Sequence, residues 1–259
     1  MKILFIGDIV AEPGRKTIKQ VLPDLRKELG VDLVVANAEN AAAGRGITPG
    51  VLEELQSYGV DYFTSGDHVF WQRGTEDVID DLPIIRPANY PEGTPGNGHF
   101  VLDLGAKGKV LLVNLMGRTS FGNVTSYTRD PFEMIDAILE SYKDEKFAAS
   151  IIDFHAEATS EKSAFGFYVD GKVTAVIGTH THVPTCDHRV LPKGTMFVSD
   201  AGMTGIIDSV LGVKTDIVIN LFKSARNQRF EWESAGTKAF RSVLLDTVEG
   251  SIERVDKVL

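Results

Sequence analysis

The sequence predicts an α/β protein whose sheet is parallel near the N-terminus and mixed further along the chain, with helices outside it. Two observations support this fold class. Short apolar runs alternate with helical segments over residues 2–64, an order typical of parallel strands joined by right-handed crossovers. After residue 99, further apolar runs are separated by turn residues, and two of them form an expected hairpin. We therefore expect a two-layered or sandwiched arrangement.

The first strand is predicted at residues 2–6, a short apolar run at the N-terminus. A helix is expected from about residue 15 to residue 29, opened by Pro13 and Gly14 and stopped by Gly30. Pro23 lies inside this span and should kink or divide the helix, because proline lacks the backbone N–H that the helix needs.

The second strand is predicted at residues 32–36, and a loop of small residues follows it at 41–46. Thr48 and Pro49 then form an N-cap followed by proline at the first helical position. The helix that they open is expected to run to residue 58. Residues 60–64 follow as the third strand.

The character of the chain changes after residue 82, where prolines and glycines predict an irregular stretch to residue 98. Residues 100–104 and 109–115 are expected to form a hairpin. Residues 116–129 form a polar loop rich in Gly, Ser and Thr. The remaining expected elements are a helix at 131–142, strands at 148–154, 173–177 and 195–199, and a closing hairpin from 237 that turns at residues 249–250. Without repeats or linkers, residues 1–259 are expected to form one domain.

The composition is that of a globular protein, with 43% hydrophobic and 24% charged residues in 259. A net charge of −9 without runs of like charge argues against stable nucleic-acid binding. Cys186 is the single cysteine, so a disulfide framework is excluded. No apolar stretch approaches the ~20 residues of a membrane span, and the first strand leaves no room for a signal peptide. We expect a cytoplasmic protein, and a homo-oligomer is compatible with the sequence.

Acidic residues and histidines follow the expected strands at the points where those strands end. The carboxyl ends of the strands share one edge of an α/β sheet, and ligands bind at that edge. Taken singly, Asp8 could serve as a helix or turn cap, and Glu39 could form an ion pair with Arg15 or Arg45. Together, however, these residues suit a pair of divalent metal ions. The residues are Asp8, Glu39, Asn40, Asp67, His68, His155, His180 and His182.

The most specific signal is the pair His180 and His182, one residue apart just beyond an apolar run. Such a pair is a plausible set of ligands for first-row transition metals. The alternative is that both are surface histidines of a polar loop, but this would not explain why the loop directly follows the apolar run at residues 173–177. Asp153 and His155 share a strand face because alternate residues do so. His99 and His188 stand outside this pattern and serve as internal controls.

These motifs, in this order, resemble the calcineurin-like metallophosphoesterases. The superfamily has Asp after the first strand, an acidic bridge after the second, Gly-Asn-His, a lone His and Gly-His-x-His. Its bacterial YmdB-like branch of 2′,3′-cyclic nucleotide phosphodiesterases is the closest match, since its bridging Glu is followed by Asn, as in Glu39–Asn40. Residues 153–162 and 178–184 also look like members of that branch, and the resemblance covers nearly the whole chain.

The resemblance implies an αββα fold and two transition-metal ions per chain, iron or manganese. Asp8, Glu39, Asn40 and His182 would hold one ion. Glu39, Asp67, His155 and His180 would hold the other, with Glu39 bridging. A hydroxide bridging the ions would attack a small phosphodiester, expected in this branch to be a 2′,3′-cyclic nucleotide, and His68 would act as the general acid.

Two positions depart from the superfamily pattern. Thr179 precedes the His pair as an insertion, which is normal for this branch. Asp67 stands where the family usually has Asn. Three carboxylates and one hydroxide balance the four positive charges of two divalent ions, and a neutral centre attracts phosphate less. We therefore expect either that one ion is trivalent, such as Fe³⁺, or that Asp67 weakens catalysis.

Substrate contacts are less evident, because Arg45, Arg118 and the loop 119–128 suit either substrate binding or solvated loops. Three rival functions also remain open. The first is a phosphomonoesterase or phosphoprotein phosphatase with the same metals. The second is a regulatory nucleotide-binding protein with weak turnover, and the third is a metal-free α/β domain.

Overall fold

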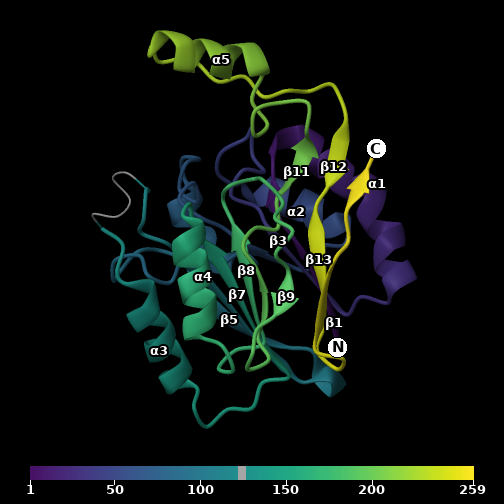
Figure 1. Cartoon of the computed structure of the whole chain (residues 1–259), viewed down its shortest axis with the longest axis vertical. Helices are drawn as coiled ribbons and strands as arrows, with labels where there is room; N and C mark the ends of the chain where they lie inside the picture. The colour runs from purple at the N-terminus through teal and green to yellow at the C-terminus, as the bar shows by residue number, and fades with distance from the viewer. Residues whose placement is uncertain (122–126) are drawn as a thin grey trace.

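A computed structural model of the chain describes residues 1–121 and 127–259 and contains three sheets (Figure 1). The five-stranded sheet has the order β14–β13–β1–β3–β4. In it β1, β3 and β4 run parallel, and β13 lies antiparallel to β1. Its strands are β1 (Lys2–Ile6), β3 (Leu33–Asn37), β4 (Tyr62–Thr64), β13 (Ser242–Asp246) and β14 (Ser251–Arg254).

The second sheet has six strands in the order β5–β6–β7–β8–β10–β9. The four central strands are parallel, and the edge strands β5 and β9 are antiparallel to their neighbours. The strands are β5 (His99–Asp103), β6 (Lys109–Met116), β7 (Ala149–His155), β8 (Ala175–Thr179), β9 (Arg189–Val190) and β10 (Met196–Val198). The expected hairpin at residues 100–115 is confirmed as β5 and β6.

A small third sheet has the order β15–β12–β11–β2 and joins the two ends of the chain. Its strands are β2 (Asp8–Ile9), β11 (Met203–Ile206), β12 (Lys238–Phe240) and β15 (Lys257–Val258). The predicted closing hairpin therefore extends through two sheets, since β13 and β14 belong to the first. The helices are α1 (Ala11–Leu29), α2 (Pro49–Ser57), α3 (Pro131–Ser141), α4 (Thr159–Tyr168) and α5 (Thr215–Ser224), with short 3₁₀ turns at Thr75–Asp77, Ile79–Asp81 and Gly105–Lys107.

The two large sheets pack face to face between two layers of helices. Alternate residues of a strand point to opposite faces, and Ile3 and Phe5 of β1 share one buried cluster with Leu112 and Ile151 of the second sheet. The other faces pack against helices. On the second sheet, for example, the rings of Phe154 in β7 and Phe165 in α4 stack with centroids 4.3 Å apart. The predicted layered α/β class is confirmed.

The structure corrects two expectations about the first helix. It begins at Ala11, four residues before the predicted start, so that Pro13 and Gly14 lie within its first turn. Pro23 does not divide it. The proline is on the exposed face of α1, where water can hydrate the carbonyl that loses its partner.

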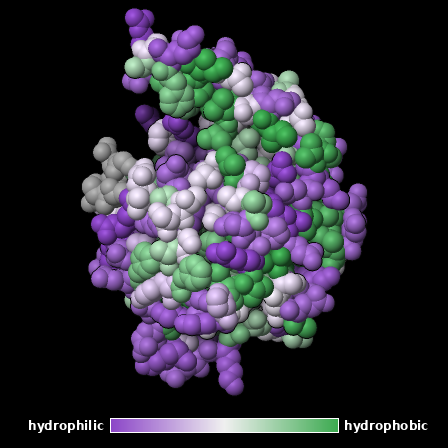
Figure 2. Space-filling view, in the orientation of Figure 1, coloured by the Kyte–Doolittle hydropathy of each residue, from purple (hydrophilic) through white to green (hydrophobic). Residues whose placement is uncertain are grey.

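Five helices or strands of the described residues have no counterpart among the predicted elements, namely β2, α4, β9, β11 and α5. Of these, α5 stands apart from the sheets at the end of the molecule (Figure 1), and Val218 is its single buried residue. Hydrophobic residues gather on and below this helix in the space-filling view (Figure 2). Within the described residues, no helix combines the length and the apolar character needed to cross a membrane.

Candidate metal centre

All the predicted site residues lie where strands of the two large sheets end. Asp8 follows β1 and begins β2, while Glu39 and Asn40 follow β3. Asp67 and His68 follow β4, His155 is the last residue of β7, and His180 and His182 follow β8. The two sheets present their carboxyl ends at the same end of the molecule, and segments distant in the sequence therefore meet. The deepest of these side chains are fully or almost fully buried, namely Asp8, Glu39, Asn40 and His155.

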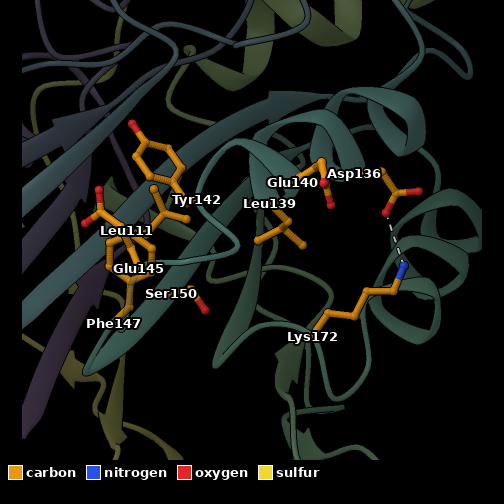
Figure 3. Close-up of a pocket in the computed structure, with 9 residues that line it drawn as sticks. All are labelled: Leu111, Asp136, Leu139, Glu140, Tyr142, Glu145, Phe147, Ser150 and Lys172. Atoms are coloured by element: carbon orange, nitrogen blue, oxygen red, sulfur yellow. Dashed lines mark hydrogen bonds and ion pairs between the residues drawn. The ribbon is translucent and has the colours of Figure 1, made fainter.

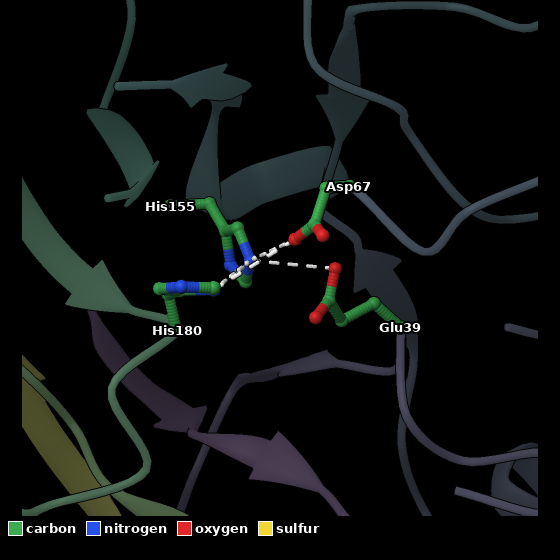
Figure 4. Close-up of side chains that lie close together, drawn as sticks. All are labelled: Glu39, Asp67, His155 and His180. Carbon is green, nitrogen blue, oxygen red and sulfur yellow. Dashed lines mark hydrogen bonds and ion pairs between the residues drawn. The ribbon is translucent and has the colours of Figure 1, made fainter. Parts of the chain in front are cut away.

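Four of these residues converge on one point (Figure 4). The ligand atoms of Glu39, Asp67, His155 and His180 all lie within 4.8 Å of one another. His155 Nε2 is 3.3 Å from Glu39 Oε2 and 3.4 Å from Asp67 Oδ1. His180 Nδ1 is 3.1 Å from His155 Nε2. Two carboxylates and two imidazoles at this spacing are a suitable donor set for a transition-metal ion.

A second group lies beside the first. His182 Nε2 is 3.2 Å from Asn40 Oδ1 and 3.9 Å from Asp8 Oδ1. Asp8 Oδ2 accepts a long hydrogen bond of 3.3 Å from the backbone N–H of His180, which ties the two groups together. Asp8, Asn40 and His182 could therefore hold a second ion next to the first.

Two further observations fit bound cations. Among the described residues, Asp8 Oδ1 and Asp67 Oδ1 are buried oxygens that accept no hydrogen bond, which is costly for a carboxylate unless a cation is near. At Gly66, a Cβ atom would lie 2.2 Å from Glu39 Oε2 and 2.3 Å from His155 Nε2. Glycine at this position thus keeps the space between the donor atoms free.

The pKa values of the cluster reflect crowding of buried charges. Burial raises the pKa of Asp8 to about 7. Burial also opposes ionisation of Glu39 and His155, but their mutual attraction outweighs it, so the pKa of Glu39 is well below and that of His155 well above the usual value. Burial lowers the pKa of His180 to about 3 and also lowers that of His182. The carboxylates therefore stabilise positive charge at His155, as they would stabilise a metal cation.

His155 is oriented by residues that the sequence did not single out as a set. Thr179 Oγ1 donates to Asp153 Oδ1 at 2.6 Å, and His155 Nδ1 lies 2.8 Å from the same hydroxyl. Asn37 Nδ2 also donates to Asp153, at 3.0 Å. This network assigns the proton of His155 to Nδ1 and leaves the lone pair of Nε2 facing the centre. Asp153 thus supports His155 rather than lining the centre. In the sequence, the position of Asp153 two residues before His155 indicates that the two side chains share a strand face.

The loop that carries His180 and His182 is held by a buried ion pair. Lys162 Nζ lies 2.7 Å from Asp200 Oδ2 and donates to the carbonyl of Thr179 at 2.8 Å. Asp200 Oδ2 accepts from both the N–H and the hydroxyl of Thr181. Sequence reasoning missed Asp200, although an acidic residue just after β10 repeats the pattern of the other strand ends.

His68 lies at the edge of the cluster. Its Nδ1 is 3.1 Å from Glu39 Oε1 and 3.1 Å from Asn40 Nδ2, and its ring meets Trp71 edge to face with centroids 5.3 Å apart. Burial lowers the pKa of His68, but hydrogen bonding and charge of Glu39, together with the charge of Asp67, outweigh it and raise the pKa. A larger fraction of His68 is therefore protonated near neutral pH, as a general acid requires.

The predicted controls and substrate contacts are also located. His99 forms a hydrogen bond of 3.0 Å with the Tyr142 hydroxyl, and His188 belongs to no group of potential metal ligands in the described part of the chain. Arg118 is 3.8 Å from Asp130. Residues 122–126 of the loop 119–128, for which the sequence leaves substrate binding and a solvated loop as equal alternatives, fall outside the described residues. Arg45 lines a cavity of about 350 Å³ beside the centre.

Another cavity lies away from the centre (Figure 3). It measures about 520 Å³ and is lined by residues around α3, including Tyr142, Leu139 and the ion pair of Lys172 with Asp136. It contains none of the predicted site residues. The chemistry is therefore expected at the smaller cavity, which Glu39, His68, His180 and His182 line.

Comparison with known proteins identifies the family. The family model of YmdB-like proteins matches residues 4–258. A 2′,3′-cyclic-nucleotide 2′-phosphodiesterase of Bacillus subtilis (strain 168) is 43% identical over 249 residues, which cover 95% of this chain and 91% of that protein. Two crystal structures superpose with TM-scores of 0.90. One is a hypothetical protein of Thermus thermophilus with 38% identity, and the match covers 100% of this chain and 99% of that one. The other, described as a novel phosphatase of Mycoplasma pneumoniae, has 33% identity over 100% of this chain and 93% of that one. The predicted resemblance is thus confirmed, and the chain belongs to the YmdB-like family of metallophosphoesterases.

Proposed function

We propose that the chain is a metal-dependent phosphodiesterase that hydrolyses 2′,3′-cyclic nucleotides. The observation that carries this function is the convergence of the predicted residues, with His68 at the rim of a metal-type donor set and a cavity in front of it. The name of the Bacillus relative supports the substrate class.

In this proposal Asp8, Glu39, Asn40 and His182 hold one ion. The other is held by Glu39, Asp67, His155 and His180, with Glu39 shared between the two. Mixed oxygen and nitrogen donors favour iron or manganese over magnesium, which prefers oxygen alone. Ions bound there lower the pKa of a coordinated water and neutralise charge on the phosphate oxygens.

The reaction adds the oxygen of one water to phosphorus and breaks the bond between phosphorus and the ribose O2′. The departing O2′ is a poor leaving group as an alkoxide. His68 donates the proton that makes it a hydroxyl, and the phosphate stays on O3′. Nδ1 of the protonated His68 donates to Glu39 Oε1, which leaves Nε2, 3.6 Å from Asp67 Oδ2, as the atom that donates to the substrate.

Product analysis tests the proposal. With Mn²⁺ added, the protein is expected to convert 2′,3′-cyclic AMP to 3′-AMP, and Asp8→Ala should abolish this turnover. A phosphomonoester such as nitrophenyl phosphate should be hydrolysed more slowly. Preference for the monoester would favour the phosphatase alternative. Tight nucleotide binding without turnover would instead indicate a regulatory protein.

A further inference from the structure

The cavity beside the metal centre has two chemically different walls. His68, Asn40 and His182 form the polar wall, while Leu211, Phe230 and Trp232 from the chain on either side of α5 form the apolar wall. The site residues account for the first wall. Phosphodiester hydrolysis as such does not require the second.

Arg45 also lines this cavity and lies close to two aromatic rings. The guanidinium carbon of Arg45 lies 4.8 Å from the ring centroid of Trp71 and 5.3 Å from that of Phe230. The side chain forms no ion pair with any carboxylate that the structure describes. Its neighbours Gly44 and Gly46 both adopt left-handed backbone conformations, which glycine tolerates. The loop can therefore approach two tryptophans closely, with Gly44 against Trp232 and Gly46 against Trp71.

We propose that this cavity is a nucleobase subsite in which the base stacks against Phe230 beside the Arg45 guanidinium. The inference rests on the proposed function and specifies its substrate. If O2′ departs toward His68, the ribose must lie along the wall that His68 lines. The base attached to it then reaches the apolar wall. Flat aromatic and guanidinium surfaces bind bases of any sequence because every base has a π-face.

The other pocket next to the centre suits the base less well. It is lined by Phe70, Trp71, Tyr90 and Tyr127 and touches the metal-type cluster only through Asp67. His68 does not line this pocket, whereas it does line the cavity beside α5. The geometry therefore favours the cavity on the α5 side.

The test compares two cyclic phosphodiesters that differ only in the base. One is 2′,3′-cyclic AMP, and the other is methyl ribofuranoside 2,3-cyclic phosphate, in which a methoxy group replaces adenine. For Phe230→Ala, kcat/KM on cyclic AMP is expected to fall roughly 5- to 100-fold, mainly through KM, as is typical of a lost base–aromatic stack. The base-free substrate should be hydrolysed as by the wild type.

Phe230 is preferable to Trp232 for this test, because Trp232 packs so closely on Gly44 that a Cβ there would lie 1.8 Å from its ring. A second variant, Phe222→Ala, removes a lining side chain that is 81% exposed and hence dispensable for folding. It should show the same selectivity with a smaller loss. Phe167→Ala is the matched control, since Phe167 also meets an arginine (Arg189, at 5.8 Å) but lies outside this cavity.

The outcomes are distinguishable. If wild-type protein hydrolyses both substrates and Phe230→Ala affects them equally or not at all, the base subsite is wrong while the phosphodiesterase activity stands. If the wild type hydrolyses neither, the proposed function fails and the subsite with it. A loss confined to the substrate that carries the base, absent in Phe167→Ala, establishes the subsite.

Discussion

Lys162 and Asp200 form an ion pair of 2.7 Å between two side chains that are each 1% exposed. The pair fixes Thr181 through two hydrogen bonds to Asp200. The flanking residues His180 and His182 have φ angles of 98° and 65°, a left-handed conformation that is costly for histidine. The ion pair therefore helps to hold a strained loop in the geometry that directs both imidazoles at the centre.

Replacing Lys162 by Met should destabilise the protein strongly. The change leaves the carboxylate of Asp200 buried without its counter-charge, which typically costs ~3–5 kcal/mol. Urea unfolding measures the effect. Lys172→Met is the matched control, because Lys172 and Asp136 are 3.1 Å apart but both about half exposed, and such pairs contribute ~0–1 kcal/mol. Similar small losses in both variants would contradict the role of the buried pair.

Gly66→Ala should impair metal binding without unfolding the protein. The new methyl group would occupy the space between Glu39 Oε2 and His155 Nε2, so those donors would have to move apart. Mn²⁺ affinity is expected to fall by at least the ~10–100-fold seen when an outer-shell partner is lost. Titration calorimetry with Mn²⁺ measures this. Gly50→Ala is the control, since no atom lies within 4 Å of a Cβ there. Wild-type affinity in Gly66→Ala would argue against this centre.

The loss of rate in His68→Ala should depend on the leaving group of the substrate. A general acid typically contributes ~10²–10⁴-fold, and that loss is expected on 2′,3′-cyclic AMP, whose ribose oxygen leaves poorly. An activated nitrophenyl ester needs little protonation and should lose much less. Steady-state kinetics on both substrates decide the matter. Equal losses would refute the acid role of His68.

Metal content tests the charge argument about Asp67. Elemental analysis of the purified protein should find iron or manganese, and chelation should abolish turnover until Mn²⁺ is restored. If both ions are divalent, Asp67→Asn should bind Mn²⁺ more weakly but turn over faster when saturated, because the centre gains one positive charge. If one ion is Fe³⁺, the centre is already positive with Asp67, and the same variant should bind iron more weakly without the gain in turnover. A protein free of transition metals would overturn the metal centre itself.

The convergence of the candidate ligands could be predicted because each follows an apolar run that only a buried strand explains. Asp8, Glu39 and His155 are polar residues at positions where burial without a partner is expensive. The supports of the site were harder to predict. Lys162 is buried although lysine is rarely so, and its partner Asp200 is 38 residues away. Only the fold brings them together.

The missed α5 illustrates a different limit. Its sequence contains Ile217, Val218 and Ile219, and β-branched residues favour strands by intrinsic propensity. Ile219 is 53% exposed, and Val218 is the single buried residue of this helix. The helix therefore lacks the buried apolar face by which a surface helix is usually predicted. The apolar wall of the cavity was therefore not foreseen, although the polar wall was.

The small sheet in which β2 pairs with β11 has a consequence for biosynthesis. Asp8 lies opposite Met203 in that pairing, so the earliest donor is anchored only after most of the polypeptide has left the ribosome. A loop of this length closes late in folding, because the chain loses conformational entropy on closure before the contacts that compensate for the loss have formed. The complete set of candidate ligands should therefore assemble only after the C-terminal part of the chain has been synthesised.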